Sequence, residues 1–135
     1  MKKLLYTFVL LILVGCNGEV KTEVKSFEFA SEIRKINVIG QGSNAGYRRE
    51  IENTVEINVI KNAMQNAIIL SGPHTDEGPL YEIEVIYAND SKDKIDLWYY
   101  ASANTGRFYI NSMYSLNEEA TSALIELFES YKAGK

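Results

Sequence analysis

The clearest strand pattern in the chain is Tyr81-Glu82-Ile83-Glu84-Val85-Ile86-Tyr87, in which apolar and acidic residues alternate. Successive side chains of a strand point to opposite faces, so this period of two separates the apolar side chains from the two glutamates. Two further strand patterns follow at residues 95–100 and 107–110. The connections between the three segments are too short for parallel crossovers, and they predict an antiparallel meander.

Helical patterns lie on both sides of this meander. Asn53 is a good N-cap with Glu56 three residues later, and apolar residues then recur at helical spacing until about Leu70. A last helix is expected after Ser115 or Asn117, with acidic residues near its positive N-terminus. Each helix would carry one apolar stripe that has to be covered by the sheet.

Upstream of the first helix, residues 33–39 and 47–52 predict two more strands, joined by a loop with three glycines. The glycine spacing is not that of a phosphate-binding loop, and a hairpin tip is the simpler interpretation. The predicted order of elements is therefore ββαβββα. The expected fold class is α+β, with a single antiparallel sheet, both helices packed on one face and the other face open.

The first sixteen residues have the layout of a secretory signal. Lys2 and Lys3 precede an apolar run at residues 4–14, which is too short to span a bilayer that needs about 20 apolar residues. The run ends Leu13-Val14-Gly15-Cys16, which resembles the lipobox of bacterial lipoproteins. The resemblance implies a diacylglyceryl thioether on Cys16 and cleavage after Gly15. The alternatives are an ordinary signal peptide, or a buried apolar strand with a chance cysteine.

Composition agrees with export and limits the class of partner. Cys16 is the only cysteine among 135 residues, so an internal disulfide is excluded, whereas lipidation explains a lone exported thiol. The net charge of −4 becomes −6 when Lys2 and Lys3 are removed, which disfavours a nucleic-acid or anionic-lipid partner, because both need a basic face. The expected organisation is a signal peptide at 1–15, a lipidated cysteine and polar tether at 16–31, and one domain at 32–135.

From about residue 33 to residue 130, the order of these patterns resembles the YhfM-like domain of small lipoproteins from Bacillus-type bacteria. The matching pieces are the capped helix after Asn53, the Gly72-Pro73 loop leading to Tyr81-Glu82-Ile83-Glu84-Val85, the Leu97-Trp98 pair, and Tyr114-Ser115-Leu116-Asn117-Glu118-Glu119-Ala120. The resemblance implies lipid anchoring and an α+β fold. It implies no reaction, and it transfers no catalytic residue.

One histidine invites a catalytic or metal-binding hypothesis. His74 lies near Ser71, Asp76 and Glu77 on a loop rich in glycine and proline. A catalytic triad assembles residues that the fold holds firmly, and a zinc site needs three or four ligands. A solvated loop histidine is the simpler interpretation, so no catalytic residue, metal or cofactor is expected.

A spaced set of aspartates raises the question of calcium. Asp90, Asp93 and Asp96 recur every three residues, with Lys92 and Lys94 between them. Calcium loops alternate their oxygen ligands more closely and include a glycine and a bidentate glutamate. A solvated turn is therefore the simpler interpretation.

The strongest candidate for a binding surface is the open face of the predicted sheet. The residues expected there are Trp98, Tyr100 and Tyr109, beside Glu82 and Glu84. Exposed aromatic residues on a sheet often mark a binding surface. Two alternatives stay open: the segment of Phe27 and Phe29 could cover this face, or the aromatic pairs could only stabilise the sheet.

The functional expectation is a membrane-tethered, extracytoplasmic lipoprotein that is not an enzyme. It would be attached to the cell membrane through diacylglyceryl-Cys16 and would contact a protein, a peptide or a cell-envelope component. Contact would use the open sheet face or the loop at residues 71–79. The alternatives are an inhibitor or accessory subunit of an exported enzyme or transporter and, third, a small hydrolase, which would need a pocket of convergent ionisable groups.

Overall fold

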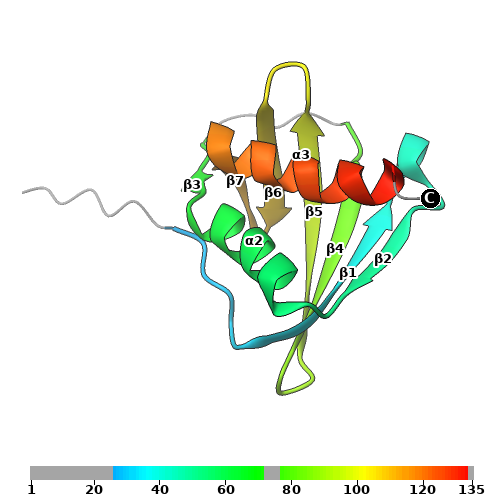
Figure 1. Ribbon diagram of the computed structural model, residues 1–135. Coiled ribbons are helices and arrows are strands. Elements are labelled where there is room, and N and C mark those ends of the chain that lie inside the picture. Colours follow the sequence, from blue (N-terminus) through cyan, green and yellow to red (C-terminus); the bar gives the residue numbers. More distant parts are fainter. Residues whose placement is uncertain (1–25, 72–76, 134–135) are drawn as a thin grey trace, which may run out of the picture.

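The computed structural model describes residues 26–71 and 77–133, which form one antiparallel sheet covered by helices on one side (Figure 1). The sheet has seven strands in the order β2-β1-β4-β5-β6-β7-β3. In chain order the elements are β1 (Ile33–Gly40), the 3-10 helix η1 (Gly42–Asn44), β2 (Arg48–Ile51), α2 (Thr54–Gln65), β3 (Ile68–Ile69), β4 (Tyr81–Tyr87), β5 (Lys92–Tyr100), β6 (Thr105–Ile110), β7 (Ser112–Leu116) and α3 (Glu118–Ala133). The predicted α+β class is confirmed.

The alternating strand β4 lies near the middle of the sheet, between β1 and β5. Ile83 is paired with Val38 of β1 and with Ile95 of β5, and all three side chains are fully buried. Residues paired directly across strands share a face, so these pairs define the side that the helices cover. Glu82 and Glu84 therefore point to the opposite side of the sheet, as the alternation predicts.

Both helices pack on this apolar face (Figure 1). Asn53 caps α2 by accepting hydrogen bonds from the amides of Val55 and Glu56, as the sequence predicts. Ile60 of α2 and Phe128 of α3 are fully buried over the sheet. Within the described part of the chain, neither helix is long and apolar enough to cross a membrane.

The prediction for residues 66–70 is wrong. Helix α2 ends at Gln65, where the side-chain amide of Asn66 turns back to donate to the carbonyl of Asn62. Ile68 and Ile69 then form strand β3, which pairs with β7 at the edge of the sheet. Strands β3 and β7 were not predicted. The two residues of β3 are too few for a visible alternation, and they continue the apolar spacing of α2.

The folded part also begins earlier than the expected domain start at residue 32. Phe27 is buried among Phe29, Phe108 and Tyr114, with ring centroids 4.8 to 5.5 Å apart. Phe108 is paired with Leu97 on the helix-covered face. The segment at Phe27 therefore completes the core on that face and does not cover the opposite face.

Candidate functional site

The face away from the helices carries all five residues of the predicted binding surface. The register of the strands sets their arrangement: Glu82 of β4 lies opposite Asp96 of β5, Asp96 lies opposite Tyr109 of β6, and Trp98 lies opposite Arg107. We refer to this side as the open face. The face carries two clusters side by side. The aromatic cluster consists of Trp98 and Tyr100 with Arg107 and Glu77, and the acidic cluster consists of Glu82 and Asp96 with Tyr109.

Trp98 lies on the open face but is only 7% exposed. Its indole Nε1 donates a hydrogen bond to the backbone oxygen of Glu77 at 3.0 Å, and the guanidinium carbon of Arg107 lies 5.4 Å from the ring centroid. The expectation of an exposed tryptophan is therefore not met. Trp98 fixes the start of the segment that leads into β4, and its cover could not be foreseen because Glu77 contributes a backbone atom.

The two tyrosines of the predicted surface are accessible. Tyr100 is 38% exposed and Tyr109 is 42% exposed. The Tyr100 hydroxyl donates to the Glu77 carboxylate at 2.7 Å and accepts from Arg107 at 3.3 Å, and the hydrogen bond to Glu77 raises the pKa of Tyr100. Tyr100 thus belongs to the aromatic cluster that holds Glu77, whereas Tyr109 lies in the acidic cluster, opposite Asp96.

The acidic cluster contains two like charges that face each other. Glu82 and Asp96 are direct cross-strand partners, with the Nζ of Lys94 lying 3.5 Å from an oxygen of Glu82. Burial raises the pKa of Asp96, and the negative charge of Glu82 raises it further, while Lys94 opposes both effects. Like charges placed directly opposite on a sheet destabilise it. The sequence shows both residues, but only the register shows that they face each other.

Glu84 has a different role from Glu82. It lies opposite Asn37 of β1, whose side-chain amide donates to the Glu84 carboxylate at 3.1 Å. On the other side it is paired with Lys94 of β5. Glu84 is thus held by an amide donor, whereas the ammonium of Lys94 lies against Glu82 and offsets only part of the like-charge repulsion between Glu82 and Asp96.

The spaced aspartates do not converge on a calcium site. Asp90 forms a 2.9 Å ion pair with Arg34, and Asp93 accepts a 2.5 Å hydrogen bond from the Tyr87 hydroxyl on the helix-covered side. Asp96 points to the open face, because three residues along a strand reverse the direction of the side chain. Among residues 26–71 and 77–133, no group of three or more His, Cys, Asp or Glu side chains could hold a metal ion.

His74 and Asp76 lie outside the described residues. Of the loop residues considered with them, Ser71 is exposed and Glu77 is engaged by Trp98 and Tyr100. The part of this loop that the structure describes is therefore held on the open face by its backbone and by one carboxylate.

Strongly perturbed tyrosines lie on the helix-covered side. Burial raises the pKa of Tyr99 far above its usual range, and its hydroxyl donates to Glu129 at 2.7 Å and lies 3.4 Å from the Tyr81 hydroxyl. Burial and the hydrogen bond to Asp93 raise the pKa of Tyr87 to about 12. Both hydroxyls stay protonated at neutral pH and act as hydrogen-bond donors: Tyr99 ties α3 to the sheet, and Tyr87 links β4 to β5.

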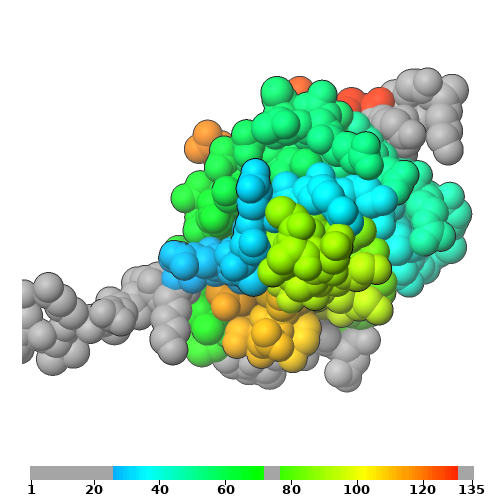
Figure 2. All heavy atoms as spheres, turned by 90° about the horizontal axis from the view of Figure 1, so that it is seen from below, coloured from blue at the N-terminus to red at the C-terminus, as the bar shows by residue number. Residues whose placement is uncertain are grey.

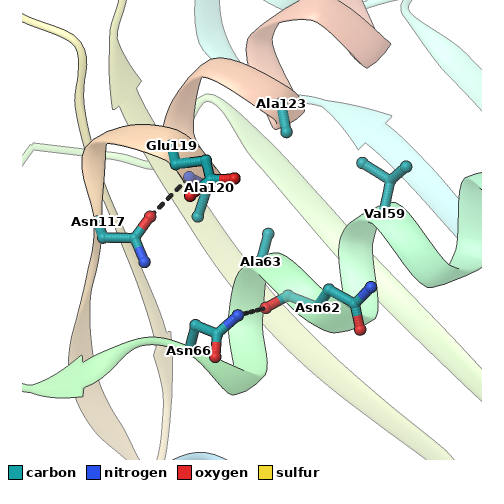
Figure 3. A pocket seen from close by; sticks show the side chains of 8 residues that line it. All are labelled: Val59, Asn62, Ala63, Asn66, Asn117, Glu119, Ala120 and Ala123. Carbon is teal, nitrogen blue, oxygen red and sulfur yellow. Dashed lines mark hydrogen bonds between the residues drawn. The ribbon is translucent and has the colours of Figure 1, made fainter.

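A hollow of about 260 Å³ lies between the end of α2 and the start of α3 (Figure 3). Three alanines, Ala63, Ala120 and Ala123, line it and let the helices approach closely. The polar groups around it are used by the helix ends: Asn117 accepts from the amide of Ala120 at 2.7 Å, and Asn66 donates to the carbonyl of Asn62 at 2.9 Å. The hollow is therefore accounted for by helix capping and close packing.

A family model described as YhfM protein matches residues 30–133, which include every strand and helix from β1 to α3. No curated protein and no solved structure matches the chain.

Proposed function

The chain belongs to the YhfM family, and we propose that it is a lipid-anchored, extracytoplasmic protein whose domain is a non-enzymatic binding module. The ligand proposed is a basic segment of a polypeptide, bound on the open face at Glu82, Asp96 and Tyr109. The observation that carries this proposal is the direct pairing of Glu82 with Asp96 beside an exposed tyrosine.

The lipid anchor rests on the residues of the signal region. The positive start, the short apolar run and the Leu13-Val14-Gly15-Cys16 motif support attachment through Cys16. A diacylglyceryl group supplies two acyl chains, and two chains hold a protein stably on a membrane where one chain does so only marginally. The anchored domain would therefore stay beside the membrane on its outer side.

The like-charge pair supports a cationic ligand. Glu82 and Asp96 repel each other in the unbound protein, and a lysine or arginine side chain placed between them would relieve this repulsion. Charge-assisted hydrogen bonds to carboxylates are about twice as strong as neutral ones. The exposed ring of Tyr109, directly opposite Asp96, can add a cation–π contact to the same side chain.

A non-enzymatic role agrees with the way the ionisable groups are used. The tyrosines with strongly raised pKa values, Tyr87 and Tyr99, donate hydrogen bonds to Asp93 and Glu129 within the packed domain. The carboxylates of the open face lie on a broad sheet surface, where a flexible segment of another chain can lie across several strands. Such a surface favours recognition over the enclosed, convergent geometry of catalysis.

The binding test uses the full chain, purified from membranes, and two labelled peptides of equal length. One peptide carries lysine and arginine at alternate positions and the other carries glutamate at the same positions. The basic peptide should bind, and the variant Glu82→Gln/Asp96→Asn should weaken its binding at least about tenfold, because a charge-assisted contact contributes about 1.5 to 3 kcal/mol.

The matched control is Asp90→Asn/Glu118→Gln, which also removes two carboxylates, one at an exposed turn beside Arg34 and one exposed at the start of α3. It should leave binding unchanged. Equal loss of binding in the control would show that only net charge matters, and equal binding of both peptides would reject the cationic ligand. The anchor is tested separately with Cys16→Ser, since a Cys16→Ser protein that still partitions wholly with membranes would exclude lipidation as the anchor.

A further inference from the structure

One edge of the sheet exposes three consecutive apolar residues. Ile68, Ile69 and Leu70 are 57%, 40% and 41% exposed, and we call them the β3 edge. No charged residue occurs from Asn66 to Ser71. Sheet edges in water are normally protected by charges or by a covering segment, so an exposed and uncharged apolar edge indicates a contact that the isolated domain does not make.

The β3 edge lies where the chain enters the domain. Ser26 forms an antiparallel bridge with Ile68, so the first described residue sits directly against β3. Figures 1 and 2 show the blue N-terminal segment at this end of the molecule, near β3 and the orange strand β7. Cys16 precedes Ser26 by ten residues, and ten residues span at most about 36 Å even when fully extended.

The strand beside β3 places a buried apolar side chain behind this edge. The amide of Leu70 donates to the carbonyl of Met113, and Met113 is paired with Tyr109 of β6. Met113 is buried between these neighbours, while Leu70 and Tyr109 remain exposed. Exposed aliphatic side chains such as Leu70, gathered at one edge of a domain, are typical of surfaces that sit at the boundary between lipid and water.

We propose that the β3 edge rests in the interfacial layer of the membrane, so that the sheet stands on this edge with both of its faces turned to the aqueous space. This inference rests on the proposed lipid anchor at Cys16. The short connection raises the local concentration of the edge at the bilayer, and a few apolar side chains then add to the binding supplied by the lipid.

Lipid fits this edge better than a second copy of the chain does. Edge-to-edge pairing needs a row of available backbone groups, whereas β3 has only two residues and its outer side already meets Ser26. Contact with lipid needs no backbone pairing and no matching charge, and this uncharged edge offers only apolar side chains.

The test uses full-length protein reconstituted into vesicles of phosphatidylcholine and phosphatidylglycerol. Lipid blocks Cys16, so a nitroxide label attached to Ile69→Cys is the only label, and Leu70→Cys provides a second position at the same edge. The matched control is Val55→Cys, another apolar residue, which is 72% exposed at the start of α2 away from β3. Collision of each label with oxygen and with a water-soluble nickel chelate is measured by electron paramagnetic resonance.

The ratio of oxygen to nickel collisions should be at least roughly threefold higher at residue 69 than at residue 55, because the polar chelate is excluded from apolar lipid. Equal aqueous exposure of both labels in membrane-bound protein would overturn the proposal. Spin–spin broadening at residue 69 with protection from both reagents would assign the edge to a second copy and would also overturn it. A protein with an unmodified Cys16, shown by mass spectrometry of its peptide, would instead reject the lipid anchor and the inference with it.

Discussion

Replacing Asp96 with asparagine should stabilise the domain at neutral pH. The substitution keeps the size and shape of the side chain and removes one of two negative charges that face each other across β4 and β5. Cross-strand pairs contribute about 0.2 to 1 kcal/mol. Because Asp96 is partly exposed and Lys94 offsets some of the repulsion, a gain of about 0.5 kcal/mol is expected after allowance for solvent screening.

The effect has a defined pH dependence. Burial and Glu82 raise the pKa of Asp96, so the folded protein holds this proton more tightly than the unfolded chain does. The contribution of Asp96 to stability is then fully present below its unfolded pKa of about 4, and it is lost as pH rises through the folded pKa. The advantage of Asp96→Asn over the wild type should therefore be absent near pH 3 and complete at pH 7.

Thermal and urea unfolding at several pH values measure this gain, which corresponds to a rise in Tm of about 2 to 4 °C for a domain of this size. Asp93→Asn is the control, since it makes the same change on the other face of β5 and weakens the hydrogen bond from Tyr87, so it should lower stability. A gain that is as large at pH 3 as at pH 7, or an Asp96→Asn variant no more stable than the wild type, would refute the electrostatic account.

Two further substitutions test the backbone and the helix cap. Gly40→Ala should destabilise the domain by about 1 to 3 kcal/mol in urea unfolding, because the added Cβ would lie 1.9 Å from the backbone oxygen of Asn44, whereas Gly78→Ala enters open space and should be nearly neutral. Asn117→Ala should cost about 1 kcal/mol by removing the acceptor for the amide of Ala120 at the start of α3, and Asn117→Ser, which keeps a capping oxygen, should recover most of this loss.

The long elements could be predicted because their patterns are local. The alternation at Tyr81–Tyr87 predicts a strand and its buried side, and the cap at Asn53 predicts where a helix begins. The structure confirms both. Strand β3 could not be predicted in this way. Ile68 and Ile69 satisfy the helical spacing that precedes them, and only pairing with Ser115 and Tyr114 across the sheet makes them a strand.

The open face shows the same division between local and non-local information. The alternation places Glu82 and Trp98 on that face, as the structure confirms for their direction. Whether a residue on the face is accessible depends on other segments: the Glu77 backbone buries Trp98, and no pattern around residue 98 contains that information. Likewise, the significance of Asp96 depends on register, which a single strand does not reveal.

The two proposals together constrain how the domain would meet a partner. If β3 is the edge in contact with lipid, β2 at the far end of the sheet points away from the membrane. Glu82 and Asp96, on β4 and β5 near the middle of the sheet, then lie on an open face that stands roughly perpendicular to the bilayer surface. A basic segment of a membrane-associated protein could reach this open face from the side, and anionic lipids would also attract its cationic residues to the bilayer surface.

Detachment of the domain by Cys16→Ser should therefore weaken capture of a membrane-bound basic ligand while leaving binding of the free peptide unchanged. Equal loss of both would mean that the substitution acts on the fold, and not through the geometry set by the anchor.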